Sequence, residues 1–255
     1  MSDEPVPAGG PTRVVVIGGS SGIGLAAVER FAADGASVYA LSRRGTAPPP
    51  ERPERPGSGR PGRVISLAVD ATDADAIGRC LADVVAEGDV DTLVYCAGLN
   101  VPERRLSQLT PASWRAMVAA NLDGAYYALA ACLDSLRRRR GIVILVSSAS
   151  ALWTNQSGAA YQASKAGLMA LARAGNFEEH GAGIRFATIF PGVVDTPHLD
   201  RRPRPPDAAT RRQMLTPDDV ASACHYVAGL PPRVCIPELV LLPTALQTPG
   251  NTCVE

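Results

Sequence analysis

The sequence is almost without lysine: of its 25 basic residues, 24 are arginine, and Lys165 is the only lysine. It also has no excess charge, because 25 acidic residues balance the basic ones. A neutral chain has no overall field that would attract nucleic acid or an anionic membrane. The expected partner is therefore a small molecule, and neither nucleic acid nor a membrane is expected.

Targeting signals and metal motifs are missing as well. The N-terminus has no basic segment followed by an apolar one, and no run of 18 apolar residues occurs. We therefore expect a cytoplasmic protein. The six cysteines are scattered, without a C-x-x-C pair or a histidine cluster. Neither a disulfide framework nor a metal site is expected.

What the sequence does contain is a regular alternation of strand-length apolar runs and longer segments of helical period. A chain of 255 residues with 46% apolar residues suits one large domain, here residues 13–245. The expected strands lie near 13–18, 36–42, 63–69, 91–96, 141–147, 184–190 and 235–242. The expected helices lie near 22–34, 73–87, 111–136, 158–180 and 217–229. This alternation predicts an α/β fold, a Rossmann-type doubly wound parallel sheet of seven strands with helices on both faces.

Some segments break this alternation. Residues 44–62 are so rich in proline, glycine and charge that we expect a loop insertion, and residues 1–12 and 246–255 are expected to be tails. Residues 197–216 follow a strand end, where α/β sheets bind ligands, and are our candidate substrate lid. The lid carries Arg201, Arg202, Arg204, Arg211 and Arg212. An anionic substrate or solvated surface charge explains these arginines equally well.

The first expected strand runs into a glycine-rich turn and then a helix. A turn this tight needs glycine, and its bare backbone lets a helix N-terminus approach a pyrophosphate. The turn therefore predicts a dinucleotide site. The residues expected to bind there are Gly18, Ser20, Ser21, Gly22, Ile23 and Gly24. Gly24 has the alternative role of helix–strand packing alone.

The second and third strand ends indicate which dinucleotide binds. The second strand ends in Ser42, Arg43 and Arg44, where an acidic residue would repel a 2′-phosphate and a guanidinium would bind it. This favours NADP(H), although surface arginines would look the same. Asp70, followed by Ala71, is placed to accept from the adenine amino group; its alternative role is a helix N-cap.

Tyr161 and Lys165 are four residues apart on an expected helix, so both project from one face. Protonating an alkoxide at neutral pH requires an acid, and a free phenol has a pKa near 10. A neighbouring ammonium and the positive nicotinamide of the oxidised cofactor would lower that pKa. The only lysine of the chain stands at that position, which indicates that a compact ammonium is required there.

Two polar residues complete the expected catalytic group. Ser148, at a strand end, would polarise the substrate oxygen, or it simply caps the strand. Asn121 lies inside an expected helix, where asparagine disturbs the backbone ladder, and would hold a water for proton relay; an ordinary helix residue is its alternative. His198 lies just past Thr196, where it lines the pocket or is a bystander.

These residues, in this order, resemble the short-chain dehydrogenase/reductase family over residues 13–242. The resemblance identifies Asn121, Ser148, Tyr161 and Lys165 as an active-site tetrad and the glycine turn as the cofactor turn. It also implies an NADP-dependent enzyme that interconverts an alcohol and a carbonyl, and a homodimer or homotetramer paired through helices 111–136 and 158–180. The further cofactor-binding positions that it implies are Cys96, Ala97, Gly98, Pro191, Gly192, Val194 and Thr196, with Tyr161 and Lys165.

The C-terminal half, in Leu215–Ala221 and Ile236–Val240, is most similar to NADP-dependent 3-hydroxy acid and serine dehydrogenases, which by analogy suggests a hydroxy acid substrate. Two departures stand out: Ile17 replaces the family's usual threonine, and Tyr95-Cys96 replaces its usual Asn-Asn. Lost hydrogen bonds there would loosen the nucleotide site or the sheet. The alternatives are a redox sensor that binds NADP(H) without catalysis, and an epimerase or dehydratase, whose glycine spacing differs from that of this chain.

Overall fold

The computed structural model describes residues 12–45 and 62–247, which form one parallel sheet of seven strands with its helices. The sheet order is β3-β2-β1-β4-β5-β6-β7, so the chain reverses its direction of winding between β1 and β4. The strands are β1 (Arg13–Ile17), β2 (Ser37–Ser42), β3 (Val64–Ala68), β4 (Thr92–Tyr95), β5 (Ile142–Val146), β6 (Arg185–Pro191) and β7 (Glu238–Leu241). The predicted fold class is confirmed.

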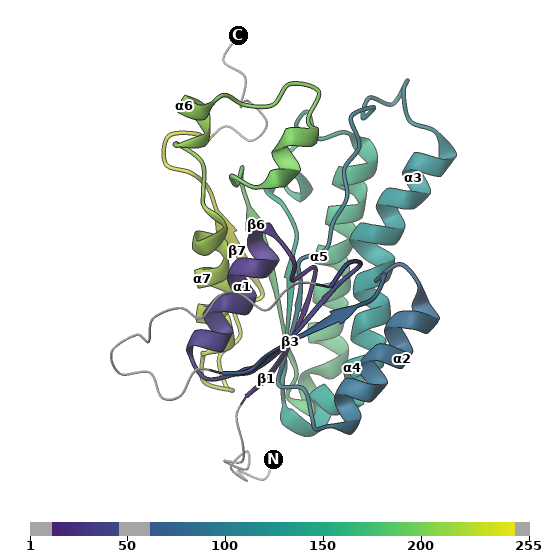
Figure 1. Cartoon of the computed structure of the whole chain (residues 1–255), viewed down its shortest axis with the longest axis vertical. Helices are drawn as coiled ribbons and strands as arrows, with labels where there is room; N and C mark the ends of the chain where they lie inside the picture. The colour runs from purple at the N-terminus through teal and green to yellow at the C-terminus, as the bar shows by residue number, and fades with distance from the viewer. Residues whose placement is uncertain (1–11, 46–61, 248–255) are drawn as a thin grey trace.

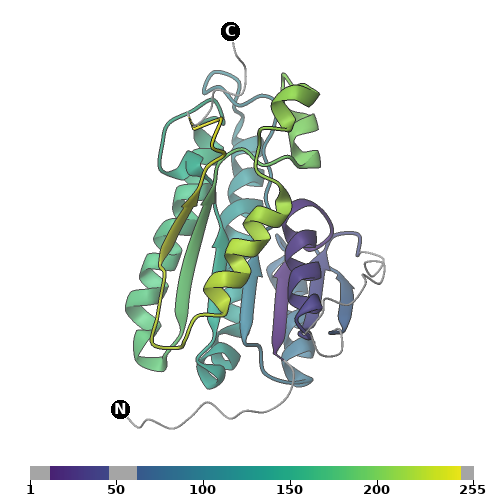
Figure 2. The ribbon, with the colours of Figure 1, turned by 90° about the vertical axis from the view of Figure 1, so that its left-hand side faces the viewer.

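Helices cover both faces of this sheet. On one face α1 (Gly22–Ala33) packs against α7 (Pro217–Ala228), and both lie in front of the sheet in Figure 2. The other face carries α2 (Ala74–Ala86), α4 (Gly124–Arg139) and α5 (Ala159–Glu179), seen on the right of Figure 1. After Arg13, successive residues of β1 enter opposite core clusters, which explains why positions 14–17 are all apolar.

The long helix expected over 111–136 is interrupted. It consists of α3 (Pro111–Val118), a π-helical turn η1 (Ala119–Asp123) and α4. Among the described residues, the run Pro111–Arg139 has the length and mean hydropathy, 1.3, of a membrane-spanning helix. However, α4 packs against α2, and its residues Leu129, Cys132 and Leu136 are buried in the core of the domain. This run is therefore a core helix, which passes the same test of length and composition.

Some of the connections between these elements contain short helices. They are η2 (Ala149–Ala151), η3 (His180–Ala182), η4 (Pro197–Arg201) and α6 (Ala208–Arg211). The candidate lid, residues 197–216, holds η4 and α6 and is tied back to the sheet end by the Val194–Leu215 bridge. Residues 1–11, 46–61 and 248–255 lie outside the described part of the chain, and with them most of the expected tails and loop insertion.

Candidate active site

A cavity of about 760 Å³ opens at the carboxyl edge of the sheet, around the point where the winding reverses. Ligands of open α/β sheets bind at this position. Of the catalytic and cofactor-binding residues expected from the sequence, Asn121 alone does not line it. The cavity brings together Gly18, Ser20, Ser21, Gly22, Ile23, Gly24, Ser42, Arg43, Arg44, Asp70, Ala71, Cys96, Ala97, Gly98, Ser148, Tyr161, Lys165, Pro191, Gly192, Val194 and Thr196.

The glycine turn closes one side of the cavity. Gly18 has φ +84°, and a Cβ there would lie 2.7 Å from the Ala97 nitrogen, so both its conformation and its surroundings require glycine. A Cβ on Gly24 would overlap the Gly18 carbonyl oxygen, which shows that Gly24 serves close packing inside the turn. Gly22 faces Thr196, which lies in the segment after β6. A Cβ built on Gly22 would lie 3.2 Å from Thr196 Cγ2. The turn and the β6 end therefore meet across the cavity.

The surroundings of this turn suit an anionic dinucleotide. Helix α1 starts at Gly22 on the cavity wall and has no acidic residue in its first turn, so its N-terminal dipole is open to an anion. The Ser42 hydroxyl is buried and has no hydrogen-bond partner in the described protein. Arg43 and Arg44 are exposed beside it. An orphaned hydroxyl and two guanidinium groups fit a phosphorylated ribose.

Asp70 lines the cavity just after β3 and forms hydrogen bonds with its neighbour Thr72. Its Oδ1 accepts hydrogen bonds from the Thr72 nitrogen (3.0 Å) and from Thr72 Oγ1 (2.9 Å). The N-cap of α2 is Asp73, whose side chain accepts from the Ala76 nitrogen, so the alternative role of Asp70 as a helix N-cap is wrong. Its contact with adenine stays a prediction.

Tyr95, one of the two residues that differ from the usual Asn-Asn, forms a hydrogen bond of its own. Tyr95 is fully buried, and its hydroxyl donates to the Ala120 carbonyl (2.8 Å) in the π-turn. Gly124 leaves room for this hydroxyl, because a Cβ there would overlap it. This bond ties β4 to η1, so the expected loosening is offset. Burial raises the pKa of the Cys96 thiol to about 12, and the thiol is therefore neutral on the cavity wall.

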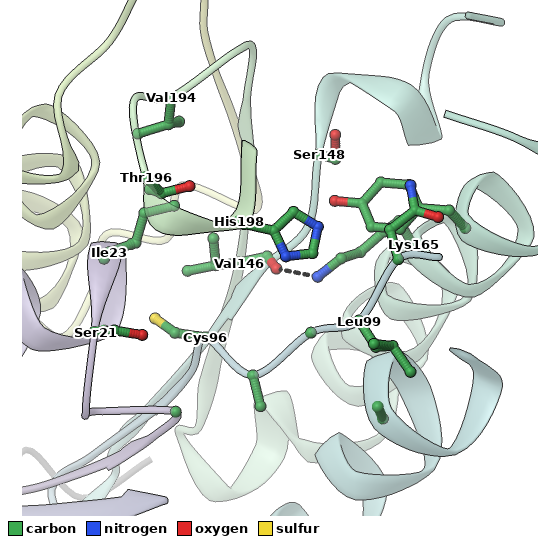
Figure 3. Close-up of a pocket in the computed structure, with 18 of the residues that line it drawn as sticks. Ser21, Ile23, Cys96, Leu99, Val146, Ser148, Lys165, Val194, Thr196 and His198 are labelled. Atoms are coloured by element: carbon green, nitrogen blue, oxygen red, sulfur yellow. Dashed lines mark hydrogen bonds between the residues drawn. The ribbon is translucent and has the colours of Figure 1, made fainter. Parts of the chain in front are cut away.

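Lys165 is buried on α5, and the residue is 3% exposed. Its Nζ donates to the Val146 carbonyl at the end of β5 (2.9 Å), the dashed line in Figure 3. Burial lowers the pKa of Lys165 to about 8. The ammonium is therefore largely protonated at neutral pH, but it is more easily neutralised than an exposed lysine.

Tyr161 lies one turn earlier on α5, with the Lys165 Nζ 5.9 Å from its ring centroid. Burial raises the pKa of the phenol above its usual value. A hydrogen bond from Ser148 and the positive charges of Arg202 and Arg104 act in the opposite direction. In the protein alone, the pKa of Tyr161 is thus raised. The lowering expected from the sequence required the nicotinamide of the oxidised cofactor as well as the neighbouring ammonium, so it stays a prediction.

Ser148 lines the cavity and is also a cap, while its action on a substrate oxygen stays a prediction. It follows β5 and lines the cavity, and its Oγ also accepts from the Ser150 nitrogen (3.1 Å) as the N-cap of η2. Its neighbour Ser147 donates to the Lys165 carbonyl (2.8 Å). The end of β5 is therefore joined to α5, which fixes the serine and the lysine relative to each other.

Asn121 is fully buried in the π-turn, behind the cavity wall. Its Oδ1 accepts from the Leu99 nitrogen (2.6 Å), and its Nδ2 donates to the Leu99 carbonyl (2.9 Å) and to Ser164 Oγ (2.9 Å). Ser164 Oγ in turn donates to the Tyr161 carbonyl (2.8 Å). Asn121 thus connects the loop after β4 to the helix that carries Tyr161.

Two further side chains, those of His198 and Arg104, line the cavity. His198 lines the cavity beside the Lys165 amine, so it is not a bystander; burial, and secondarily the nearby cations, lower its pKa to about 4. Arg104, in the loop after β4, was not expected at the site at all. Its position after the end of a parallel strand is the one feature that would have pointed to it.

Comparison with known proteins gives a consistent result. The family model described as short chain dehydrogenase matches residues 12–206. Serine 3-dehydrogenase from Rhizobium radiobacter is 30% identical over 237 residues, which cover 90% of this chain and 93% of that protein. The 3-oxoacyl-[acyl-carrier-protein] reductase MabA from Mycobacterium tuberculosis is 32% identical over 223 residues, 85% of each chain.

A solved structure is similar over nearly the whole chain. It is the alcohol dehydrogenase of the archaeon Thermococcus sibiricus, complexed with 5-hydroxy-NADP. The two structures superpose with a TM-score of 0.78 at 27% identity, over 92% of this chain and 97% of that one. The resemblance first seen in the glycine turn and in the Tyr161–Lys165 spacing therefore extends to the full fold.

Proposed function

Because this chain belongs to the short-chain dehydrogenase family, an oxidoreductase family, we propose that it is an NADP(H)-dependent enzyme that interconverts an alcohol and a ketone or aldehyde. The observation that carries the proposal is the meeting of Ser148, Tyr161 and Lys165 in the cavity that the glycine turn also lines. The printed names of both relatives, a dehydrogenase and a reductase, support the same reaction type.

The residues around the turn support the choice of NADP(H). The Ser42 hydroxyl and the guanidinium groups of Arg43 and Arg44 would hold the 2′-phosphate, and the first turn of α1 would hold the pyrophosphate. Asp70 would accept from the adenine amino group. Thr196, which faces Gly22, would contact the nicotinamide end, together with Pro191, Gly192 and Val194.

When bound, the reduced cofactor supplies the hydride that the substrate carbonyl carbon accepts. Tyr161 donates its proton to the carbonyl oxygen, and burial favours this direction because it keeps the phenol protonated at neutral pH. Ser148 donates a hydrogen bond to the same oxygen. The Lys165 ammonium, together with the cations near the phenol, stabilises the phenolate that forms.

Asn121 acts behind the reacting groups. Its hydrogen bonds to Leu99 and Ser164 hold the cavity wall against α5, where a relay water would connect Lys165 to solvent. We further propose a cytoplasmic homodimer or homotetramer. Exposed Tyr126 on α4 and Phe177 on α5 would contribute to the subunit contacts.

The second candidate function is a redox sensor, which would bind NADP(H) on the same scaffold and turn nothing over. Oxidation of NADPH with a broad panel of ketones and aldehydes, followed by absorbance, distinguishes the two. We expect turnover of at least one carbonyl compound. Tight NADPH binding without turnover of any panel member would favour the sensor.

A further inference from the structure

Charge is distributed unevenly along the cavity. At the end that holds Tyr161, the lining cations are Lys165, Arg104, Arg201 and Arg202. Among the described residues that line the cavity, the only acid is Asp70, which follows β3. In the sheet, three strands, β2, β1 and β4, separate Asp70 after β3 from the residues that follow β5. The reacting end therefore has a positive charge that no carboxylate among the described lining residues neutralises, and such a pocket favours anionic ligands.

The backbone of Arg104 is packed and its loop is hydrogen-bonded at this end of the cavity. Its backbone packs against Gly158, the N-cap of the helix that carries Tyr161, where a Cβ would lie 2.7 Å from Arg104 Cβ. Asn100 fastens the same loop, because its Nδ2 donates to the Ser157 carbonyl (3.0 Å) and its Oδ1 accepts from the Val101 nitrogen (2.9 Å). Arg104 is thus placed in advance beside the start of α5, which lowers the entropic cost of binding a ligand.

The guanidinium of Arg104 keeps most of its donors available. Its Nε donates to the Val101 carbonyl (2.9 Å), but its two Nη groups donate to no described residue. Two like charges near each other in a partly buried place repel, and both burial and Arg202 lower the pKa of Arg104. An anion between these two arginines would offset both costs and would accept hydrogen bonds from a planar fork.

We propose that Arg104, with Arg202 from the lid, binds the carboxylate of a short oxo or hydroxy acid whose carbonyl or hydroxyl group lies at Tyr161. This subsite rests on the proposed function, since it names the substrate class of the same cavity. Two of the five lid arginines, Arg201 and Arg202, line the cavity. The proposal assigns Arg202, because its charge acts on both Arg104 and Tyr161.

The test compares acids with their uncharged esters. Reduction of pyruvate, acetoacetate and levulinate by NADPH is measured beside that of their methyl esters, in the wild type and in Arg104→Gln, Arg104→Lys and Arg105→Gln. Arg105 is the exposed neighbour that does not line the cavity, so its variant is the matched control. Binding of the same acids and esters to the NADP+ complex is measured by calorimetry.

We expect the wild type to prefer at least one acid over its ester by about 10-fold or more in kcat/KM. Arg104→Gln should raise KM for that acid by about 10- to 100-fold and leave the ester within about 3-fold. Arg104→Lys should restore part of the loss, because it keeps the charge without the fork. Arg105→Gln should behave like the wild type.

Three results would overturn the subsite. One is a preference for the ester in every pair. Another is an equal loss for acid and ester in Arg104→Gln with a shifted pH profile, because Arg104 would then act on the Tyr161 phenol alone. The third is a failure of every acid to bind. Binding that depends on charge and on Arg104, without turnover, would support the subsite and contradict the proposed function.

Discussion

The amide of Asn121 pairs with both backbone polar groups of Leu99, accepting from its nitrogen at 2.6 Å and donating to its oxygen at 2.9 Å. The helix accommodates this with a π-turn at Ala119–Asp123, which brings the asparagine side chain to the loop after β4. π-Turns inside α-helices often occur at functional sites, and here the turn attaches the cavity wall to the helix of Tyr161.

Asn121→Ala should therefore lower both stability and activity. Two backbone groups of Leu99 would lose their partners, which would cost about 2 to 4 kcal/mol of unfolding free energy. The chain offers a matched control in Asn176, whose amide pairs with both backbone groups of Phe186 in the same way, away from the cavity. Asn176→Ala should lose similar stability and retain kcat.

Urea unfolding and steady-state kinetics of the two variants test this prediction. If kcat falls equally in both, the effect of Asn121 is on stability alone, and its placement in the catalytic group is wrong. A conserved kcat in Asn121→Ala would contradict the prediction as well.

Lys165 should titrate near pH 8, well below the usual lysine value, because its burial disfavours the charged form. Since it is the only lysine in the chain, labelling with isotopically enriched lysine gives a single side-chain nitrogen signal in NMR. A titration midpoint at or above the ordinary value of 10.5 would contradict the described environment.

The same shift has a consequence for stability. Between about pH 8 and 10.5 the unfolded chain binds more protons at this residue than the folded chain does. The contribution of Lys165 to the free energy of unfolding therefore rises with pH in that window. Below about pH 8 the amine is charged in both states, and burial of that charge destabilises the folded chain. Lys165→Met should lack this rise, which is seen as a difference between the two unfolding curves measured against pH.

Gly24→Ala should abolish NADPH binding or folding, because the added Cβ would overlap the Gly18 carbonyl oxygen. Gly78 is the control: it lies in α2, and a Cβ there would meet nothing within 4 Å. Gly78→Ala should leave binding unchanged and stabilise the helix by about 1 kcal/mol. Fluorescence titration with NADPH and thermal unfolding measure both effects, and normal NADPH binding in Gly24→Ala would refute the tight turn.

Arg43→Asp should weaken NADPH binding by roughly 10- to 100-fold, because it replaces a charge-assisted hydrogen bond with repulsion of the phosphate. Binding of NADH, which lacks the 2′-phosphate, should change far less. Equal losses for the two cofactors in parallel titrations would show that Arg43 does not bind that phosphate.

Residues whose role is local were the most predictable from the sequence. The apolar runs of β1 and β5 are buried on both faces, and the glycine turn is required by its own backbone, so both follow from short stretches of sequence. Asn121 in a helical segment correctly indicated a disturbed backbone ladder. The resulting π-turn was not foreseen, because it depends on Leu99 and on the Tyr95 hydroxyl, which come from another part of the chain.

Electrostatics was less predictable than position. The sequence placed Lys165 beside Tyr161, but the direction of the Tyr161 pKa is set by burial, which no spacing reports. Arg104 lay in a loop without a motif, and its proximity to the phenol depends on Gly158 and Asn100. Contacts of this kind form only when distant segments pack together.

The assignment of Tyr161 as the acid is tested by the reduction of the best panel substrate by Tyr161→Phe, with NADPH binding measured in parallel. Loss of the proton donor should lower kcat by about 100- to 10,000-fold, while the affinity for NADPH stays within about 3-fold of the wild type. A Phe variant that reduces the substrate as fast as the wild type would contradict the assignment of Tyr161 as the acid.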